Sequence, residues 1–141
     1  MKILVLNGPN LNKLGERNPK HYGAVTLESI YDKMQKEFPN IDFDFFQSNL
    51  EGELINKIQN AEQEGFDGII INPGGYAHTS AAIRDALEIC KIKKIEVHLS
   101  NLSKREEYRQ TLITASACDG YISGFKEYGY LAAVYLLMKL V

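Results

Sequence analysis

The 141-residue sequence lacks tryptophan and contains only two cysteines, Cys90 and Cys118. The two cysteines do not form a CxxC pattern, which argues against a structural zinc site and fits a reducing compartment. No apolar run approaches the roughly 18 residues that a membrane-spanning helix needs. The first hydrophobic stretch turns polar at Asn7, too early for the hydrophobic region of a signal peptide. We therefore expect a cytoplasmic protein that does not bind membranes.

The sequence also lacks an excess of basic charge. Sixteen lysines and arginines face eighteen aspartates and glutamates, for a net charge of −2. Proteins that bind duplex nucleic acid usually carry a basic excess, so we expect no nucleic-acid partner. Hydrophobic residues make up 45% of the chain and charged residues 24%, a balance that is typical of a globular core. The length predicts a single domain over residues 1–141.

Hydrophobic segments alternate with amphipathic ones along the whole chain. Four segments have hydrophobic residues at helical spacing or a helix-start pattern. They begin after Thr26, at a capping-box pattern at Ser48–Glu51, near Thr79 and at a second capping-box pattern at Ser103–Glu106. An apolar helix then closes the chain near Val141. Five β-α repeats with short connections predict a flavodoxin-like three-layer α/β sandwich with a five-stranded parallel sheet in the order 2-1-3-4-5. We expect the strands at residues 2–7, 41–47, 67–72, 94–99 and 119–124.

One connection is too long for a simple β-α turn. Residues 8–25 are rich in glycine, proline and asparagine, and loops of this length in a small domain are usually functional, often as lids. The loop carries neither a P-loop nor a GxGxxG turn, which argues against nucleotide binding. Asn7 and Asn72 end the first and third strands, where a phosphoacceptor domain would need aspartates, so phosphotransfer is not expected.

The strand at residues 94–99 places charged groups where a buried strand should be apolar. Because side chains alternate along a strand, Glu96, His98 and Ser100 share one face. A glutamate and a histidine are costly to bury unless they are paired. Two interpretations remain open: an edge strand with one solvated face, or a histidine that Glu96 orients toward the ligand-binding edge of the sheet.

Further polar groups converge on the same edge. Residues 7–10 follow the first strand, and residues 72–80 follow the third. Either cluster alone fits turn chemistry or a helix cap. Arg17 lies in the long loop, while Arg105 and Arg109 are four residues apart in a predicted helix and would share a face. A solvated helix face is the alternative interpretation for the arginines.

Together these segments resemble the type II 3-dehydroquinate dehydratases, whose motifs they match nearly from end to end. These enzymes eliminate water from 3-dehydroquinate to give 3-dehydroshikimate, through an enolate, in the shikimate pathway of aromatic amino acid biosynthesis. The resemblance implies a carbon-oxygen lyase with the flavodoxin-like fold. The matching segments are residues 7–12 (NGPNLN), 14–19 (LGERNP) with Tyr22-Gly23, 71–80 (INPGGYAHTS), 95–101 (IEVHLSN), 105–109 (REEYR) and Gly129-Tyr130.

The resemblance implies that Tyr22 is the base that removes the proton next to the ketone. Tyrosine has an ordinary pKa of about 10, so action near neutral pH requires cations that favour the phenolate. Arg17, as the transition-state stabiliser, and Arg105 match family positions that are suited to supply this field. Asn10 matches a residue that stabilises the enolate through a bound water.

The resemblance also implies the acid and the substrate contacts. His98 matches the general acid that protonates the leaving hydroxyl, and Glu96 matches the residue that orients it. No cofactor or metal is implied. Family members assemble as trimers and commonly as dodecamers of four trimers, so a homo-oligomer is expected. The implied substrate-binding residues are Asn72, His78, Asp85 (in the neighbouring subunit's site), Leu99, Ser100 and Arg109.

Two positions depart from the family pattern. Asn18 stands where an acidic residue is common, and Leu112 stands near a position that is often serine. The departure at Asn18 bears on how Arg17 in the loop is held, and the departure at Leu112 bears on local packing. The alternative function is a non-catalytic flavodoxin-like module that binds FMN or acts as a regulatory subunit, although no Ser/Thr-rich phosphate loop follows the first strand.

Overall fold

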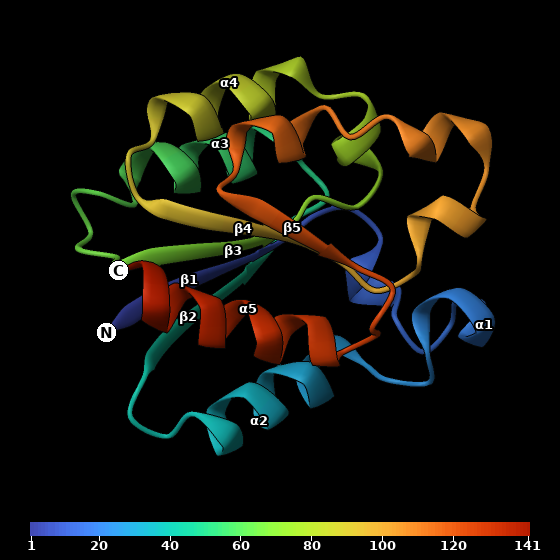
Figure 1. Ribbon diagram of the computed structural model, residues 1–141, viewed down its shortest axis with the longest axis horizontal. Helices are drawn as coiled ribbons and strands as arrows, with labels where there is room; N and C mark the ends of the chain where they lie inside the picture. The colour runs from blue at the N-terminus through green and yellow to red at the C-terminus, as the bar shows by residue number, and fades with distance from the viewer.

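A five-stranded parallel sheet forms the centre of the computed structural model, which describes residues 1–141 (Figure 1). Its strand order, β2-β1-β3-β4-β5, confirms the predicted flavodoxin-like order. Because β4 lies between β3 and β5, the interpretation of residues 94–99 as an edge strand is wrong. The strands are β1 (Lys2–Asn7), β2 (Asp42–Gln47), β3 (Gly68–Asn72), β4 (Lys93–His98) and β5 (Gly120–Ser123).

Helices cover both faces of the sheet, which explains why the inner strands are apolar on both sides (Figure 1). Helices α2 (Leu27–Glu37) and α5 (Tyr128–Leu140) lie on one face, and α3 (Glu51–Asn60) and α4 (Ala81–Ile89) lie on the other. The alternating side chains of β1 divide between two cores. Ile3 and Val5 pack on the α2–α5 side, whereas Leu4 and Leu6 pack on the α3–α4 side.

The helix starts agree only in part with the sequence patterns. Thr26 caps α2 as expected, in a reciprocal capping box with Ser29. The capping box predicted at Ser48–Glu51 is wrong, because the Ser48 hydroxyl accepts a hydrogen bond from the Leu50 amide and α3 has no side-chain cap. Glu51 instead accepts a hydrogen bond from Ser80, the residue that caps α4.

The helix predicted around Arg105 and Arg109 is also wrong. The chain after β4 forms three short 3-10 helices: η3 (Leu102–Lys104), η4 (Glu107–Gln110) and η5 (Thr114–Ala117). Asn101, not Ser103, caps the first of them. The Gln110 side chain donates to the backbone oxygens of Leu102 and Arg105, which gives these carbonyls partners outside a regular helix.

The long loop of residues 8–25 is not structureless. It contains a 3-10 helix η1 (Leu11–Lys13) and a short helix α1 (Pro19–Tyr22), which lies beyond the carboxyl ends of the strands (Figure 1). The Lys126 ammonium group donates a hydrogen bond to the Lys20 carbonyl of α1, 2.8 Å away, and so ties the loop to the chain between β5 and α5. No helix combines the length and apolarity needed to cross a membrane.

We predict that Gly8→Ala destabilises the fold. Gly8 follows β1, its amide donates to the Asn72 carbonyl at 2.8 Å, and a Cβ there would lie 2.3 Å from the Pro73 backbone oxygen. The clash is with backbone, so a loss of about 1–3 kcal/mol or more in unfolding free energy is expected in denaturant titration.

Gly52→Ala in α3 is the matched control, because a Cβ at that position meets no atom within 4 Å. This variant should be neutral or more stable by up to about 1 kcal/mol, as alanine is the better helix former. Equal stability of the two variants would contradict the packing argument at Gly8.

Candidate active site

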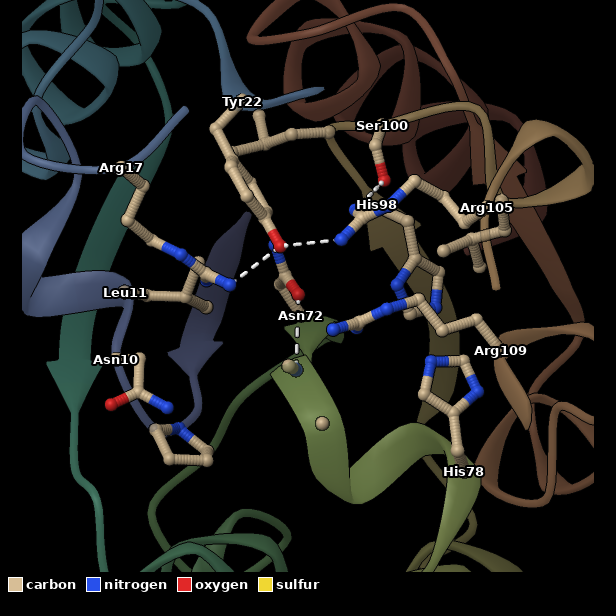
Figure 2. Close-up of a pocket in the computed structure, with 15 residues that line it drawn as sticks. Asn10, Leu11, Arg17, Tyr22, Asn72, His78, His98, Ser100, Arg105 and Arg109 are labelled. Carbon is tan, nitrogen blue, oxygen red and sulfur yellow. Dashed lines mark hydrogen bonds between the residues drawn. The ribbon is translucent and has the colours of Figure 1, made fainter. Parts of the chain in front are cut away.

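A pocket of about 90 Å³ opens at the carboxyl ends of the strands, beneath the long loop (Figure 2). Ten of the twelve predicted site residues line it; Glu96 and Asp85 are the exceptions. Glu96 lies behind His98, within hydrogen-bond distance of it. Asp85 lies on α4, outside the pocket, with its side chain 67% exposed. The predicted residues that line the pocket are Asn10, Arg17, Tyr22, Asn72, His78, His98, Leu99, Ser100, Arg105 and Arg109.

The Tyr22 phenol oxygen lies between two guanidinium groups (Figure 2). Arg17 donates to it at 2.5 Å and Arg105 at 3.1 Å. The Arg17 guanidinium also stacks on the Tyr22 ring, 3.7 Å from its centroid. Two cationic donors on one oxygen stabilise the phenolate more than the neutral phenol, so this geometry favours a tyrosine that acts as a base.

The Arg105 side chain is itself held in place from the body of the domain. It is only 6% exposed, and its Nη1 donates to the Ser100 hydroxyl at 3.0 Å. Arg105 therefore links the end of β4 to α1 in the long loop, and the position of Tyr22 depends on it. A guanidinium presents its donors in a fixed fork, which suits this double contact better than a lysine would.

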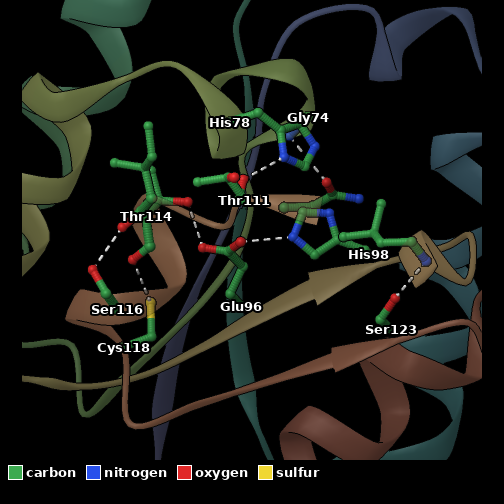
Figure 3. Close-up of polar contacts among 12 residues, drawn as sticks. Gly74, His78, Glu96, His98, Thr111, Thr114, Ser116, Cys118 and Ser123 are labelled. Atoms are coloured by element: carbon green, nitrogen blue, oxygen red, sulfur yellow. Dashed lines mark hydrogen bonds and ion pairs between the residues drawn. The ribbon is translucent and has the colours of Figure 1, made fainter. Parts of the chain in front are cut away.

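A buried acid-imidazole pair lies on β4, the strand whose sequence first indicated it (Figure 3). The His98 Nε2 and Glu96 Oε1 atoms are 2.6 Å apart, and both side chains are nearly or fully buried. An ionised carboxylate can only accept a hydrogen bond, so we place a proton on His98 Nε2. Nδ1 is then the ring nitrogen that does not bond to Glu96. The Thr114 hydroxyl donates to the second Glu96 oxygen at 2.6 Å.

His78 approaches His98 from the 3-10 helix η2 (Gly74–His78), with the two ring centroids 6.2 Å apart. Its Nδ1 lies 2.9 Å from the Thr111 carbonyl, so this nitrogen carries a proton and Nε2 is the acceptor in the neutral ring. Burial lowers the pKa of His78 below its usual value, although the bond to Thr111 opposes the shift. The neutral ring can accept a hydrogen bond from a ligand hydroxyl.

The paired ends of β1 and β3 are fixed by a tyrosine from α5. Asn7 and Asn72 are register partners, and the buried Tyr130 hydroxyl donates to Asn7 at 2.6 Å while accepting from the Asn72 amide at 3.0 Å. Burial raises the pKa of Tyr130, so its phenol stays protonated and can donate. The Asn72 oxygen accepts from the Gly74 amide, which fixes the direction of the side chain.

Asn10 has a left-handed backbone conformation, with φ of 70°, at the start of η1. Asparagine tolerates this region better than most residues. The Asn49 side chain accepts a hydrogen bond from the Asn10 amide at 3.0 Å, and Gln47 donates to the same oxygen. Asn49, in the loop before α3, therefore holds Asn10 at the pocket rim, and Gln47 at the end of β2 supports Asn49.

The charge of the pocket is strongly positive. Arg17, Arg105 and Arg109 line it together with two histidines, and no aspartate or glutamate does so. Glu106 pairs with two of these arginines from outside the lining, with one oxygen 2.5 Å from Arg109 and the other 3.7 Å from Arg105. Such a site suits a small anion that also carries hydroxyl groups. No group of three or more potential metal-ligand side chains occurs in the structure.

Sequence patterns alone did not identify three of the supporting residues. Tyr130 was named only as part of a family motif, without a role, and Thr114 and Asn49 carried no signal. Tyr130 lies more than 120 residues from Asn7 in the chain, and Thr114 is 18 residues from Glu96. Contacts over such separations have no local signature.

Comparisons with known proteins agree with this geometry. Residues 1–138 match the family described as dehydroquinase class II. The 3-dehydroquinate dehydratase of Clostridium perfringens strain SM101 is 52% identical over 141 residues, covering 99% of this chain and 97% of that protein. The type II dehydroquinase structure from Butyrivibrio crossotus has a TM-score of 0.95 at 48% identity and covers 98% of this chain and 97% of its own.

The type II dehydroquinase structure from Propionibacterium acnes has a TM-score of 0.90 at 34% identity, covering 97% of this chain and 96% of its own. These similarities extend over the whole fold and include every strand that ends at the pocket. They favour the catalytic interpretation over a flavin-binding or regulatory module.

We predict that His78 is neutral at pH 7 as the Nδ1–H tautomer. Its nitrogen NMR titration should give a midpoint below 6.5, because burial disfavours the charged ring, and the charge should appear only as the pH falls through that lower value. The His78→Gln variant assigns the signal. A midpoint at or above 6.5 would contradict the expected environment.

Proposed function

We propose that this chain, which belongs to the class II dehydroquinase family and is a 3-dehydroquinate dehydratase, eliminates water from its substrate with Tyr22 as the base and His98 as the acid. The enzyme is a hydro-lyase of the shikimate pathway. One observation supports the assignment of the base: the Tyr22 phenol oxygen accepts hydrogen bonds from both Arg17 and Arg105. No other tyrosine hydroxyl is bonded to two cations.

In the first step Tyr22 removes a proton from the carbon next to the ketone of 3-dehydroquinate. Arg17 and Arg105 stabilise the phenolate before the reaction, and Arg17 also stabilises the transition state. The proton passes to the phenolate oxygen, and the electron pair of the broken C–H bond forms an enolate. Asn10, at the pocket rim, stabilises the enolate oxygen through a bound water.

In the second step the enolate expels the hydroxyl on the neighbouring carbon as water. The imidazolium form of His98 donates the proton that this leaving group needs, from the nitrogen opposite Glu96. The Glu96 carboxylate stabilises the imidazolium and fixes the ring, in the way that a buried acid orients a catalytic histidine. Base and acid then act from different sides of the pocket, Tyr22 from the loop and His98 from the sheet.

The remaining pocket residues bind the substrate. Asn72 and the backbone amides of Leu99 and Ser100 bind its carboxylate at the ends of β3 and β4. His78, through its acceptor nitrogen, and Arg109 bind the ring hydroxyls. The cationic lining supports an anionic substrate, since three arginines face the cavity without an acid among the lining residues. The segment of residues 8–25 closes over the bound molecule as a lid.

We further propose that the enzyme acts in the cytoplasm as a homo-oligomer, a dodecamer of four trimers. Asp85 lies outside its own pocket and is 67% exposed, which fits a residue that completes a neighbour's site. Several large apolar side chains of α5 are also exposed, as at a subunit interface. Both cysteines are free thiols, which suits a reducing compartment.

We predict that Tyr22→Phe lowers kcat by about 10²–10⁴-fold, the contribution expected of a general base, while substrate binding is largely retained. The product's enone absorbance reports turnover, and calorimetry reports binding. Tyr128→Phe is the matched control, because Tyr128 is exposed and outside the pocket. Turnover of Tyr22→Phe at the wild-type rate would exclude Tyr22 as the base.

A second prediction concerns Asp85. Alone, Asp85→Asn should bind substrate less tightly than wild type although its own pocket is intact. Oligomers reassembled from a mixture of the Asp85→Asn and Tyr22→Phe chains should regain activity, because some sites combine an intact Tyr22 with an intact Asp85 from the neighbour. A mixture no more active than the mean of its two parents would show that Asp85 does not act between subunits.

A further inference from the structure

Glu96 is a carboxylate in the interior of the protein. It lies on β4 between two other strands, and none of its surface is exposed. A buried carboxylate is costly unless its oxygens accept hydrogen bonds. His98 supplies one donor, to Oε1. The other oxygen, Oε2, needs a second donor. The proposed role of His98 as the acid does not supply one, because His98 bonds only to Oε1.

Thr114 supplies that second donor (Figure 3). Its side chain is fully buried at the start of η5, and its hydroxyl oxygen is 2.6 Å from Glu96 Oε2. Figure 3 shows Glu96 between Thr114 on one side and His98 on the other, so the three side chains form one line of hydrogen bonds. The 3-10 helix η5 therefore touches the acid-imidazole pair from the side away from the pocket.

The other titratable groups near Glu96 do not replace this donor. His78 approaches from η2, and its proton-bearing nitrogen is bonded to Thr111. Cys118 follows η5, burial raises the pKa of its thiol, and its sulfur contacts the Thr114 carbonyl instead of Glu96.

We propose that Thr114 is a positioning residue for the elimination, one that holds the Glu96 carboxylate aimed at His98. The inference rests on the proposed role of His98 as the acid. Without the hydroxyl, Oε2 is a buried acceptor with no donor, which favours a Glu96 side chain that rotates away from His98. A rotated Glu96 stabilises the imidazolium less, so proton donation to the leaving hydroxyl becomes slower.

The test compares three variants of the full-length enzyme. Thr114→Val keeps the shape of the side chain but removes the hydroxyl, and Thr114→Ser keeps the hydroxyl but removes a methyl group. Ser116→Ala is the matched control: it removes a hydroxyl from the same 3-10 helix, one that bonds to Arg84 and the Ile113 carbonyl and not to Glu96. Turnover and KM are measured for each variant, together with thermal unfolding.

We expect kcat of Thr114→Val to fall about 10–100-fold, the size of effect seen when a group that orients a functional side chain is lost. KM should change little, because Thr114 is not among the pocket-lining residues. Thr114→Ser and Ser116→Ala should turn over at close to the wild-type rate. If Thr114→Val does not fold, Thr114→Ala provides the same comparison with Thr114→Ser.

The inference is overturned if the hydroxyl-free variant turns over at the wild-type rate, or if Thr114→Ser is impaired as much as Thr114→Val. His98→Asn separates this failure from failure of the proposed function. An inactive His98→Asn beside a fully active Thr114→Val rejects only the role of Thr114. A fully active His98→Asn rejects the role of His98 as the acid, and with it the proposed role of Thr114.

Discussion

The site depends on one buried charge. Glu96 lies inside a sheet whose other interior side chains are mostly apolar, and a carboxylate there persists only if both of its oxygens have donors. One donor comes from His98 on the same strand and the other from Thr114, which enters from η5. The requirement to compensate Glu96 therefore fixes a histidine at the pocket and ties a distant 3-10 helix to it.

The parallel sheet explains why the remaining groups meet at the same place. In a doubly wound sheet the carboxyl ends of all strands lie at one edge, next to the point where the strand order reverses. β1 and β3 deliver Asn7 and Asn72 to this edge as register partners, and β4 delivers His98. The long connection after β1 brings Arg17 and Tyr22 over the same edge. The proposed base and the proposed acid thus come from elements with different constraints, a loop and an inner strand.

Much of this arrangement could be predicted from the sequence, because its determinants are local. Continuous apolar runs indicated inner strands, and the alternation of Glu96 and His98 in one strand left two interpretations, an edge strand or a paired histidine, of which the sheet order excludes the first. The region after β4 could not be predicted in the same way. Its capping-box pattern at Ser103 and Glu106 favoured a helix, but Asn101 and Gln110 bind the local backbone and hold short 3-10 helices instead.

The residues that support the site were the least predictable, for a physical reason. Tyr130 and Thr114 act through single hydrogen bonds to partners that are distant in the chain. No repeating sequence pattern identifies the hydrogen-bond partner of a buried hydroxyl in a helix or turn. Only the fold shows that each of them satisfies a polar group which would otherwise be buried without a bond.

The turnover of Glu96→Gln tests the importance of the buried charge most directly. The amide has nearly the shape of the carboxylate but no charge, so it can remain beside His98 without stabilising the imidazolium. We expect a folded enzyme whose kcat falls by up to about 10⁴-fold, as when the acid that orients a catalytic histidine is replaced by its amide. A folded Glu96→Gln enzyme with wild-type kcat would contradict the central role of this carboxylate.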